Sequence, residues 1–524
     1  MQRRTATILG IDAGTTSVKT VAFTLDGAIV GVARSTVHIA RGEHGEAEAD
    51  MNRVWDAAAT TVSAVVDQIS ADGHEVVAIG ITGQGDGAWF VDERGVPVRD
   101  AALWLDARTS DRLDAWLLDG RADAVARATG SPLFPGAVPL LLADLADTDP
   151  EARARIATQL NCKDWLRFKM TGRRATDPSE ASRGWLDTAT GRYSDDLLEA
   201  LGQSDMRDRL PEVLDPVSVA GALDSRVAAS LGLPPGIPVS VGLVDTAAAG
   251  VGLGAVNDGD GYAILGTTGF VGVNHARRSD VRVDASIVLS TGRGTQVLES
   301  LAPMTGTPNL DWVRDTLGLG DLDWREVERQ AAAVPPGSNG VVYLPYGSPS
   351  GERAPFFDSA ASAAWLGMSI TTSPGELLRS VYEGLAFGLA ECLDALGLDG
   401  ALAICGGGSD SDLLCSVLAD VSGREVRRQD APEVGARGSA IMAGVAAGVF
   451  ADLPAGVAAL TPSSTVFAPD DARRASYRES AAVFAATRDA LRPHWRALRR
   501  LRDAAPAPAP ADPAPAPADA TVLA

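Results

Sequence analysis

Lysine is nearly absent from this sequence, which contains only Lys19, Lys163 and Lys169 among its 524 residues. Arginine supplies almost all of the positive charge, and the formal net charge is -22. Proteins that bind duplex DNA or RNA present a basic surface to the phosphates, and nothing in the sequence indicates such a surface. The composition therefore predicts no nucleic-acid partner and a well-solvated acidic exterior.

Cysteine is also scarce, and its spacing excludes the common cysteine-based sites. The four residues Cys162, Cys392, Cys405 and Cys415 form no Cys-x-x-Cys pair and have no histidines at zinc-finger spacing. We therefore expect them to be small buried residues in a reducing compartment.

No apolar run is long enough to span a bilayer, and the first residues lack the apolar segment of a signal peptide. These absences predict a cytoplasmic protein with no membrane partner. A length of 524 residues exceeds one ordinary core and predicts two domains. The Ala/Pro-rich residues 501–524 are too poor in core-forming side chains to fold and are expected to be disordered.

Strand and helix patterns alternate along the chain, which indicates an α/β architecture. Residues 52–70 have apolar side chains on one helical face, and residues 76–82 form a continuous apolar run that predicts a buried strand. A helix is predicted to begin at Ser373, with Glu376 completing a capping box and leucines recurring every fourth residue.

A glycine turn near the N-terminus is the first candidate phosphate site. Asp12 ends an apolar run, and the small and hydroxylated residues up to Ser17 follow it, with Lys19 two residues further on. Backbone N–H groups in such a turn can approach phosphate oxygens, and a strand-end carboxylate can hold Mg²⁺. An ordinary hairpin with a turn aspartate explains the same pattern equally well.

Two further glycine turns occur after the middle of the chain. Gly266–Gly269 repeats the order of the first turn, an apolar run followed by glycine and paired threonines, and this weak repeat suggests two related domains. Gly406–Ser409 lies between a predicted strand and a helix, where nucleotides bind. The boundary is placed near Asp245, giving domains of residues 1–245 and 246–500.

Asp245 follows a continuous apolar segment that begins at Pro238, and we predict a strand that ends at this carboxylate. A strand-end aspartate commonly caps the next helix. Its functional alternative is a general base beside an acceptor hydroxyl, with a bound metal nearby. The spacing alone leaves both interpretations open.

A series of separated motifs resembles the FGGY family of carbohydrate kinases, within the actin-like ATPase superfamily. The resemblance runs from about residue 8 to about residue 447. It rests on these segments in the expected order: Gly10–Ser17, Gly45–Asp50, Cys162–Leu166, Thr176–Ser182, Leu344–Pro355, Ala364–Met368 and Glu376–Glu383.

This resemblance implies two RNase-H-like α/β domains around a central cleft, with ATP and Mg²⁺ as cofactors and a small polyol or ketose as substrate. It places the catalytic base at Asp245 and metal contacts at Asp12 and Asp245. The expected nucleotide contacts are Thr15, Thr16, Thr267, Gly306, Gly407 and Ser411, to which the composition of the turns adds Ser17, Lys19 and Gly266. The expected substrate contacts are Gln84, Asp86, Trp104, Asp106 and Asp245. A homodimer is compatible with the sequence.

The turn Gly83–Gly87 departs from the Gly-Gln-Met-His-Gly of D-xylulose kinases, because Asp86 replaces the histidine. Together with Trp104 and the 176–182 segment, it resembles the version in erythritol kinases and, less closely, L-xylulose kinases. A carboxylate can accept hydrogen bonds from two adjacent hydroxyls. A turn aspartate facing solvent is the alternative. Val244 and Thr246 also differ from many relatives, which leaves substrate fit open.

The predicted function is ATP-dependent phosphorylation of a primary hydroxyl of erythritol or a related tetritol. L-Xylulose, D-xylulose or ribulose are the alternative acceptors. A catalytically silent sugar sensor and an actin-like chaperone ATPase are the alternatives from other classes, and retention of Asp12, Asp245 and the three glycine turns disfavours the sensor.

Overall fold

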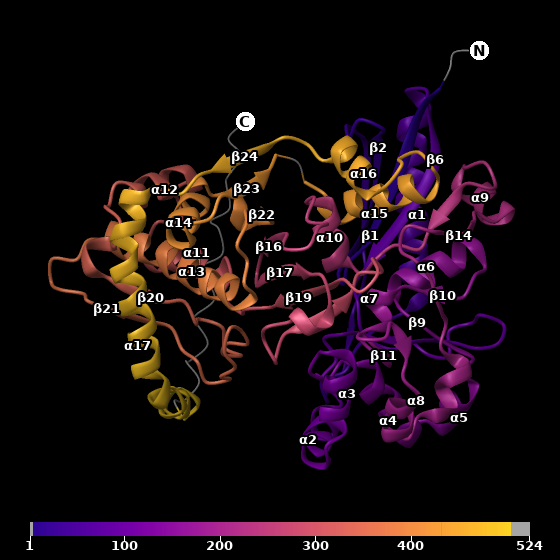
Figure 1. Cartoon of the computed structure of the whole chain (residues 1–524), viewed down its shortest axis with the longest axis horizontal. Helices are drawn as coiled ribbons and strands as arrows, with labels where there is room; N and C mark the ends of the chain where they lie inside the picture. The colour runs from indigo at the N-terminus through magenta and orange to yellow at the C-terminus, as the bar shows by residue number, and fades with distance from the viewer. Residues whose placement is uncertain (1–3, 431, 505–524) are drawn as a thin grey trace, which may run out of the picture.

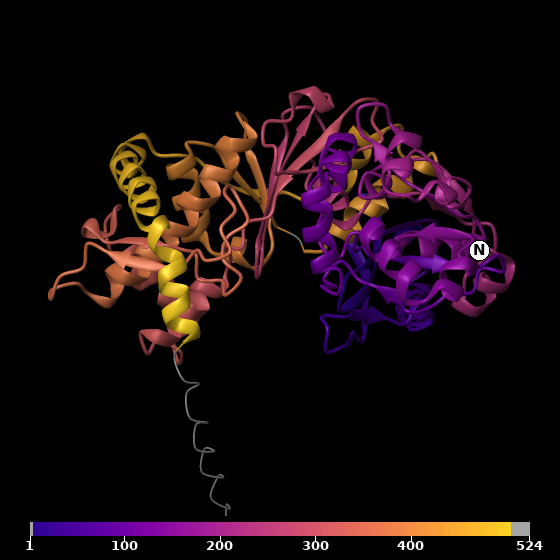
Figure 2. The ribbon, with the colours of Figure 1, turned by 90° about the horizontal axis from the view of Figure 1, so that it is seen from below.

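The computed structural model describes residues 4–430 and 432–504. Two β-sheets, each flanked by helices, form the two halves of the molecule seen in Figures 1 and 2. Within the described residues, no helix combines the length and apolar character that a membrane span requires.

The sheet of the first half has the order β14-β15-β6-β1-β2-β3. Its strands are β1 (Thr5–Ala13), β2 (Ser17–Thr24), β3 (Ile29–Thr36), β6 (His74–Gly83), β14 (Val219–Ala222) and β15 (Pro238–Ser240). The hairpins β1–β2 and β2–β3 are antiparallel, whereas β6 runs parallel to β1 and to β15.

The sheet of the second half has the order β18-β19-β17-β16-β22-β23-β24. Its strands are β16 (Gly261–Leu265), β17 (Gly269–His275), β18 (Ile287–Ser290), β19 (Val297–Leu301), β22 (Leu402–Cys405), β23 (Val426–Gln429) and β24 (Ser464–Phe467). Strands β19-β17-β16-β22-β23-β24 repeat the pairing of β3-β2-β1-β6-β15-β14, with antiparallel and parallel pairs in the same places. The weak repeat in the sequence is therefore confirmed as a repeated topology.

Outside the two large sheets, the chain forms helices and short strands, and the short strands pair in smaller sheets of their own. The short strands are β4 (Ala40–Arg41), β5 (Ala47–Ala49), β7 (Trp89–Val91), β8 (Ala101–Ala102), β9 (Thr158–Leu160), β10 (Ala175–Thr176), β11 (Leu186–Asp187), β12 (Arg192–Tyr193), β13 (Glu212–Val213), β20 (Val342–Leu344) and β21 (Ala364–Leu366). The helices of the first half are α1 (Met51–Ala71), α2 (Ser110–Asp119), α3 (Arg121–Thr129), α4 (Val138–Thr148), α5 (Pro150–Arg155), α6 (Cys162–Thr171), α7 (Pro178–Ala181), α8 (Asp195–Ala200) and α9 (Ser225–Leu231). The helices that follow along the chain are α10 (Asp245–Gly252), α11 (Pro308–Thr316), α12 (Trp324–Ala332), α13 (Pro374–Leu396), α14 (Asp412–Ser422), α15 (Val434–Ala446), α16 (Leu453–Leu460) and α17 (Asp471–Asp503).

The strongest helix predictions from the sequence are confirmed. Helix α1 extends the expected 52–70 by one residue at each end, and its apolar face packs on β2 and β3. Helix α13 begins with the predicted capping box, in which Ser373 and Glu376 each accept a hydrogen bond from the other's backbone N–H. Nearly every side of α13 is buried, because this helix lies in the centre of the second core.

The cysteines are free thiols in the structure, as their spacing predicts. Cys162, Cys392 and Cys415 are buried, and Cys405 is partly buried. Burial raises the pKa of each thiol above its ordinary value. These side chains therefore act as small apolar residues, because a thiol with a raised pKa is a weak nucleophile at neutral pH.

The path of the chain between the halves is more complex than a boundary at Asp245. After β23, the chain returns to the first half, where α15 packs on β1 and β6 and α16 packs on α15; it then crosses back to β24. Figures 1 and 2 show this orange segment beside the indigo strands of the first sheet. Residues 434–460 thus pack with the first half, although the sequence assigns them to the second domain.

Two other expectations are wrong in detail. The predicted strand 238–245 stops at Ser240, because Gly242 adopts a positive φ of 76° and residues 241–244 leave the sheet. Helix α17 continues to Asp503, so residues 501–503 are helical and not part of a disordered tail. The rest of that predicted tail, residues 505–524, lies outside the described residues.

Candidate active site

The end of β1 brings two turns of the first half together. Asp12 pairs with Lys19 across the β1–β2 hairpin and lies opposite Thr82 of β6, so both strands deliver their following turns to one edge of the sheet. The backbone N–H of Gln84 donates to the carbonyl of Ala13 at 2.9 Å. The first glycine turn and the Gly83–Gly87 turn are therefore neighbours.

The side chains of the first turn already have protein partners. Trp104, 42% exposed, donates its Nε1–H to Thr15 Oγ1 at 2.9 Å, and Arg34 Nε donates to Ser17 Oγ at 3.1 Å. Thr16 is exposed. Lys19 forms an ion pair with Glu433, the residue before α15. The Lys19 ammonium is thus held beside Asp12 by a carboxylate that is 414 residues away in the sequence.

Asp245 occupies the first turn of α10, and its carboxylate accepts the N–H of Thr246 at 2.6 Å. The N-cap position belongs to Val244, so the simple capping interpretation of Asp245 is wrong. Burial, followed by repulsion from Asp12 and then Asp86, raises the pKa of Asp245 to about 7. Such a carboxyl can take up a proton near neutral pH, which is the property a general base requires.

The carboxylate of Asp12 interacts electrostatically with that of Asp245. Burial raises the pKa of Asp12 to about 6 against the opposing effect of Lys19. A Cβ atom at Gly435, in the first turn of α15, would lie 2.6 Å from Asp12 Oδ2. The carboxylates of Asp12 and Asp245 disfavour each other's ionisation, because like charges repel. A cation bound between them would stabilise both in the charged form.

The Gly83–Gly87 turn lies next to Asp245. A Cβ atom at Gly85 would lie 2.5 Å from Val244 Cγ2 and 3.4 Å from Glu180 Oε2. Gln84 is 2% exposed, and neither its amide nitrogen nor its amide oxygen has a hydrogen-bond partner among the described residues. Since buried polar groups are normally satisfied, this amide is a candidate for a bond to a bound molecule.

Asp86 is in a turn, but it does not face solvent. Its φ of 59° fits the turn interpretation, whereas its side chain is 17% exposed and accepts from Arg183 Nε at 3.0 Å. Arg183 in turn lies over the ring of Phe134. Burial raises the pKa of Asp86, and the Arg183 charge opposes that rise. The pair presents a fixed carboxylate near Asp245.

Asp106 differs from the other expected substrate contacts. Its side chain has no exposed surface, and its carboxylate accepts from Arg108 at 2.7 Å and from the N–H of Ala47 at 2.8 Å. A direct contact with substrate would require those bonds to break. In this structure Asp106 holds the loop that carries Trp104.

Three loops of the second half lie close together: the turn at Gly266, the loop at Gly306 and the turn at Gly406. A Cβ atom at Gly306 would lie 2.3 Å from the carbonyl oxygen of Thr267, and one at Gly406 would lie 2.4 Å from that of Leu265. Only glycine allows such approaches, and Gly406 also has a positive φ of 91°. The turn at Gly266, the Gly306 loop and the 3-10 helix Gly407–Asp410 therefore form one backbone-lined surface. Ser411 caps α14 directly after it.

A cavity of about 720 Å³ joins the two halves. Its lining includes Asp12 and Lys19 from the first half, Gly406, Gly407 and Asp410 from the second, and the 432–435 segment before and within α15. This volume falls in the range of small-molecule and cofactor sites. Asp12 and Lys19, which stand at the two ends of the first glycine turn, thus line one cavity together with the third glycine turn.

Several residues of this site were not found from the sequence. Arg183 follows the 176–182 motif directly, but nothing in the sequence pairs it with Asp86. Glu433 follows no strand or motif that would mark it as the partner of Lys19. Both pairings are long-range contacts that only the folded chain reveals.

The fold is that of the actin-like ATPases, and its site suits phosphoryl transfer. The α/β topology is repeated, a cleft lies between the halves, and a carboxyl pair on one side of it faces glycine turns on the other. Family models confirm this class and refine it. The N-terminal domain model of the FGGY family of carbohydrate kinases matches residues 7–252, and the C-terminal domain model matches residues 261–447. The chain belongs to this family, and it is a phosphotransferase.

Individual relatives agree with this family. The chain is 33% identical to an erythritol kinase of Brucella abortus, over 94% of this chain and 98% of the relative. It is 31% identical to a xylulose kinase of Escherichia coli, over 84% and 90%. The crystal structure of xylulose kinase from Rhodospirillum rubrum superposes with a TM-score of 0.85 at 26% identity, over 94% of this chain and all of that one. The predicted family, fold class and enzyme class are thereby confirmed.

Proposed function

We propose that this kinase transfers the γ-phosphoryl group of ATP to a primary hydroxyl of a small acyclic polyol, with erythritol or a related tetritol as the preferred acceptor. The similarity to an erythritol kinase along nearly the whole chain supports this choice. The observation that carries the proposal is the environment of Asp245, a half-buried carboxyl with a pKa of about 7 beside the Gln84–Asp86 turn.

In the proposed reaction, Asp245 accepts the proton of the acceptor hydroxyl. The hydroxyl oxygen forms a bond to the γ-phosphorus while the bond from that phosphorus to the β–γ bridging oxygen breaks, and ADP leaves. Gln84 and the Asp86–Arg183 pair orient the remaining hydroxyls, and Trp104 covers the first turn. Closure of the two halves would exclude water, which otherwise competes as an acceptor.

The donor set at the cleft fits Mg²⁺. No group of three or more histidine, cysteine, aspartate or glutamate side chains gathers as a metal site within residues 4–430 and 432–504. Mg²⁺ commonly uses one or two carboxylates together with substrate phosphates and water, and Asp12 and Asp245 meet that requirement. The bound ion would supply charge neutralisation of the phosphate oxygens.

The nucleotide would lie between the glycine turns. On the first half we assign phosphate contacts to Thr15, Thr16, Ser17 and Lys19, and on the second to Gly266, Thr267, Gly306, Gly407 and Ser411. Since Lys19 pairs with Glu433 and Thr15 with Trp104, these partners would have to release or share their bonds when phosphate binds.

A panel of acceptors tests the substrate proposal. Purified protein, ATP and Mg²⁺ are combined with erythritol, threitol, glycerol, L-xylulose, D-xylulose or ribulose, and ADP release is measured. We expect the highest kcat/KM with a tetritol. A pentulose as best acceptor would instead support the second candidate, which similarity to several xylulose kinases favours. No turnover with any acceptor would favour the sensor.

Substitution of Asp86 tests the acceptor site. We expect Asp86→Asn to raise the KM of the preferred acceptor by about tenfold, as loss of a charged hydrogen bond implies, without changing the KM of ATP. Asp92→Asn is the control, because Asp92 also sits in a turn but its carboxylate accepts hydrogen bonds only from its own loop, from the N–H groups of Arg94 and Val96. Equal effects of the two variants would exclude Asp86 from the site.

A further inference from the structure

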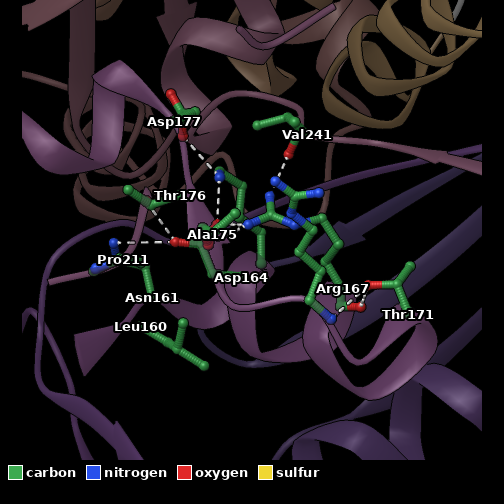
Figure 3. Close-up of polar contacts among 12 residues, drawn as sticks. Leu160, Asn161, Asp164, Arg167, Thr171, Ala175, Thr176, Asp177, Pro211 and Val241 are labelled. Carbon is green, nitrogen blue, oxygen red and sulfur yellow. Dashed lines mark hydrogen bonds and ion pairs between the residues drawn. The ribbon is translucent and has the colours of Figure 1, made fainter. Parts of the chain in front are cut away.

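A group of fully buried ionic side chains lies under the active site. Lys163, Asp164 and Arg167 on α6 have no exposed surface, and neither has Asp177, the residue that caps α7. Glu180, on α7, is 2% exposed. Figure 3 shows Asp164 and Arg167 meeting the β10–α7 segment at this point. None of these side chains reaches the cleft surface, so the reaction described above uses none of them directly.

The charges of this group are matched internally. Lys163 Nζ lies 2.7 Å from both Asp164 Oδ1 and Asp177 Oδ1, and Arg167 Nη2 lies 2.9 Å from Asp164 Oδ1. Burial alone would lower the pKa of Lys163, but Asp164 and Asp177 outweigh it and raise that pKa. Burial, the largest influence on Glu180, raises the pKa of its carboxyl well above the ordinary value. The cations Lys163 and Arg167 thus lie opposite the carboxylates of Asp164 and Asp177.

The group is connected by hydrogen bonds to the segment that carries Asp245. Arg167 Nη1 donates to the carbonyl of Val241 at 2.7 Å, as Figure 3 shows. The N–H of Val244 donates to Ser179 Oγ at 3.0 Å, and Ser179 Oγ donates to Asp177 Oδ2 at 2.5 Å. A continuous path of contacts therefore runs from Lys163 to the residue before Asp245.

This segment depends strongly on such bonds. Residues 241–244 follow β15 but make no strand pairing, and Gly242 turns the chain with a positive φ. Besides the Val244 bond, Thr82 Oγ1 donates to the carbonyl of Leu243 at 2.7 Å, and the N–H groups of Val241 and Gly242 donate to the carbonyls of Ser218 and Pro216. The backbone of Val244 sets where α10 begins, and Asp245 is the first residue of α10. A shift of Val244 therefore moves the carboxylate of Asp245.

We propose that Lys163, Asp177 and Ser179 are positioning residues for phosphoryl transfer: they fix the backbone of Val244 and thereby the carboxylate of Asp245 relative to the acceptor hydroxyl. This inference rests on the proposed role of Asp245 as the base. Misplacement of a reacting group by about 1 Å can cost a hundredfold in rate, so small shifts at Val244 are expected to be visible in kcat.

Ser179→Ala is the most informative variant. Replacing Lys163 or Asp177 would leave a buried charge without its partner and endanger folding, whereas loss of the Ser179 hydroxyl removes no charge. Thr176→Val is the matched control, because Thr176 is also a buried hydroxyl that donates to an aspartate of the group, Asp164, at 2.7 Å. Its side chain makes no bond to residues 241–245 among the described contacts.

We expect Ser179→Ala to lower kcat by about tenfold or more while the KM values of acceptor and ATP change less than about twofold. Thr176→Val is expected to retain the wild-type kcat. Ser179→Thr, which restores a hydroxyl, is expected to recover most of the lost kcat. An unchanged kcat in Ser179→Ala, or equal losses in Ser179→Ala and Thr176→Val, would overturn the proposal.

Hydrogen exchange gives a measurement that does not depend on activity. The amide of Val244 should exchange faster in Ser179→Ala than in the wild type, and Thr176→Val should leave it unchanged. Unchanged exchange in Ser179→Ala would overturn the proposed hold on Val244. If exchange rises in Ser179→Ala but Asp245→Asn retains turnover, Ser179 does hold Val244 but Asp245 is not the base. That result would overturn both the proposed function of Asp245 and this inference.

Discussion

The β1–β2 and β16–β17 hairpins occupy equivalent places in the two sheets, yet they carry different chemistry. The first has Asp12 at the end of β1 and Lys19 across from it in β2. The second passes from Leu265 to Gly269 through glycine and two threonines, with no charged side chain. Each hairpin is paired on its other side with a parallel strand, β6 or β22.

The same difference continues further along each sheet. Strand β6 leads into the turn that carries Asp86, and β15 leads towards Asp245. In the second sheet β22, the equivalent of β6, leads into Gly406 and the 3-10 helix that follows. One copy of the topology thus presents carboxylates, and the other presents glycine backbone. Carboxylates suit a metal ion and proton transfer, and backbone N–H groups suit phosphate. Under the proposed function, the carboxylates for acceptor activation therefore all come from the first half, whereas the second half supplies backbone donors for the nucleotide.

Replacing Asp245, the proposed base, should have the largest effect on kcat. We expect Asp245→Asn to lower kcat by about a thousandfold or more, since a positioned base contributes roughly 10²–10⁴-fold, with little change in acceptor binding. Steady-state kinetics and calorimetric titration of the acceptor measure the two quantities. The exposed Asp258 provides a control, as Asp258→Asn should leave both unchanged. Turnover close to wild type in Asp245→Asn would remove this residue from the mechanism.

Asp12→Asn tests the metal assignment at the end of β1. We expect kcat to fall by about a hundredfold and the Mg²⁺ concentration required for half-maximal rate to rise, because one carboxylate ligand is lost. Asp26→Asn, in the exposed β2–β3 turn, is the control. A wild-type Mg²⁺ dependence in Asp12→Asn would show that the charged hairpin does not bind the ion.

The raised pKa of Asp245 predicts a pH dependence. Because the base must be ionised, kcat/KM for the acceptor should fall by about tenfold per unit as the pH drops below about 7. A rate that is flat from pH 8 to pH 5 would contradict a base with this pKa.

The free energy of unfolding should decrease with rising pH, whereas the rate increases. The folded carboxyl of Asp245 retains a proton between about pH 4 and pH 7 that the unfolded chain releases, so the free energy of unfolding decreases as the pH rises through this window. Asp245→Asn has no carboxyl to ionise here, so its free energy of unfolding should not decrease in this way. Above pH 7 the variant should be more stable than wild type by on the order of 1–3 kcal/mol. Urea unfolding at pH 5 and pH 8 measures the difference, and equal pH dependence in both proteins would contradict it.

The smallest effect is expected at the uncharged hairpin. Thr267→Val removes one hydroxyl but leaves the backbone N–H groups, so the KM of ATP should rise by only about threefold to tenfold, with kcat nearly constant. Thr268→Val is the matched control, because Thr268 is also exposed in the same turn. A collapse of kcat in Thr267→Val would show that this hairpin does more than bind nucleotide.

Local features of the fold were predictable from the sequence, whereas long-range pairings were not. The capping box at Ser373, the apolar face of α1 and the glycine turns are encoded within short stretches, and each is present in the structure. The Asp86–Arg183 pair joins residues that are 97 positions apart. No local pattern determines which arginine approaches a given carboxylate, and this pairing made the solvent-facing interpretation of Asp86 wrong.

The same limit applies to α15. The predicted domain boundary assigns its residues to the second domain, but its small residues let it pack directly on the first sheet. A Cβ atom at Gly10 would lie 2.0 Å from the carbonyl of Ala436, and one at Gly80 would lie 2.0 Å from that of Ser439. Glycines in β1 and β6, hundreds of residues earlier, thus provide the surface for this helix, and only the folded chain shows the match.

The return of α15 and α16 to the first half has a consequence for synthesis. One core of the first half contains Ile8, Phe23 and Ala78 together with Ala440 and Ile441, so that face of the sheet stays uncovered until α15 has been made. About 200 residues separate the end of α10 from the end of α16. At roughly 5–20 residues per second, a ribosome needs about 10–40 s to make them. During that time the nascent chain exposes an apolar surface, and a chain truncated after α10 would expose it permanently.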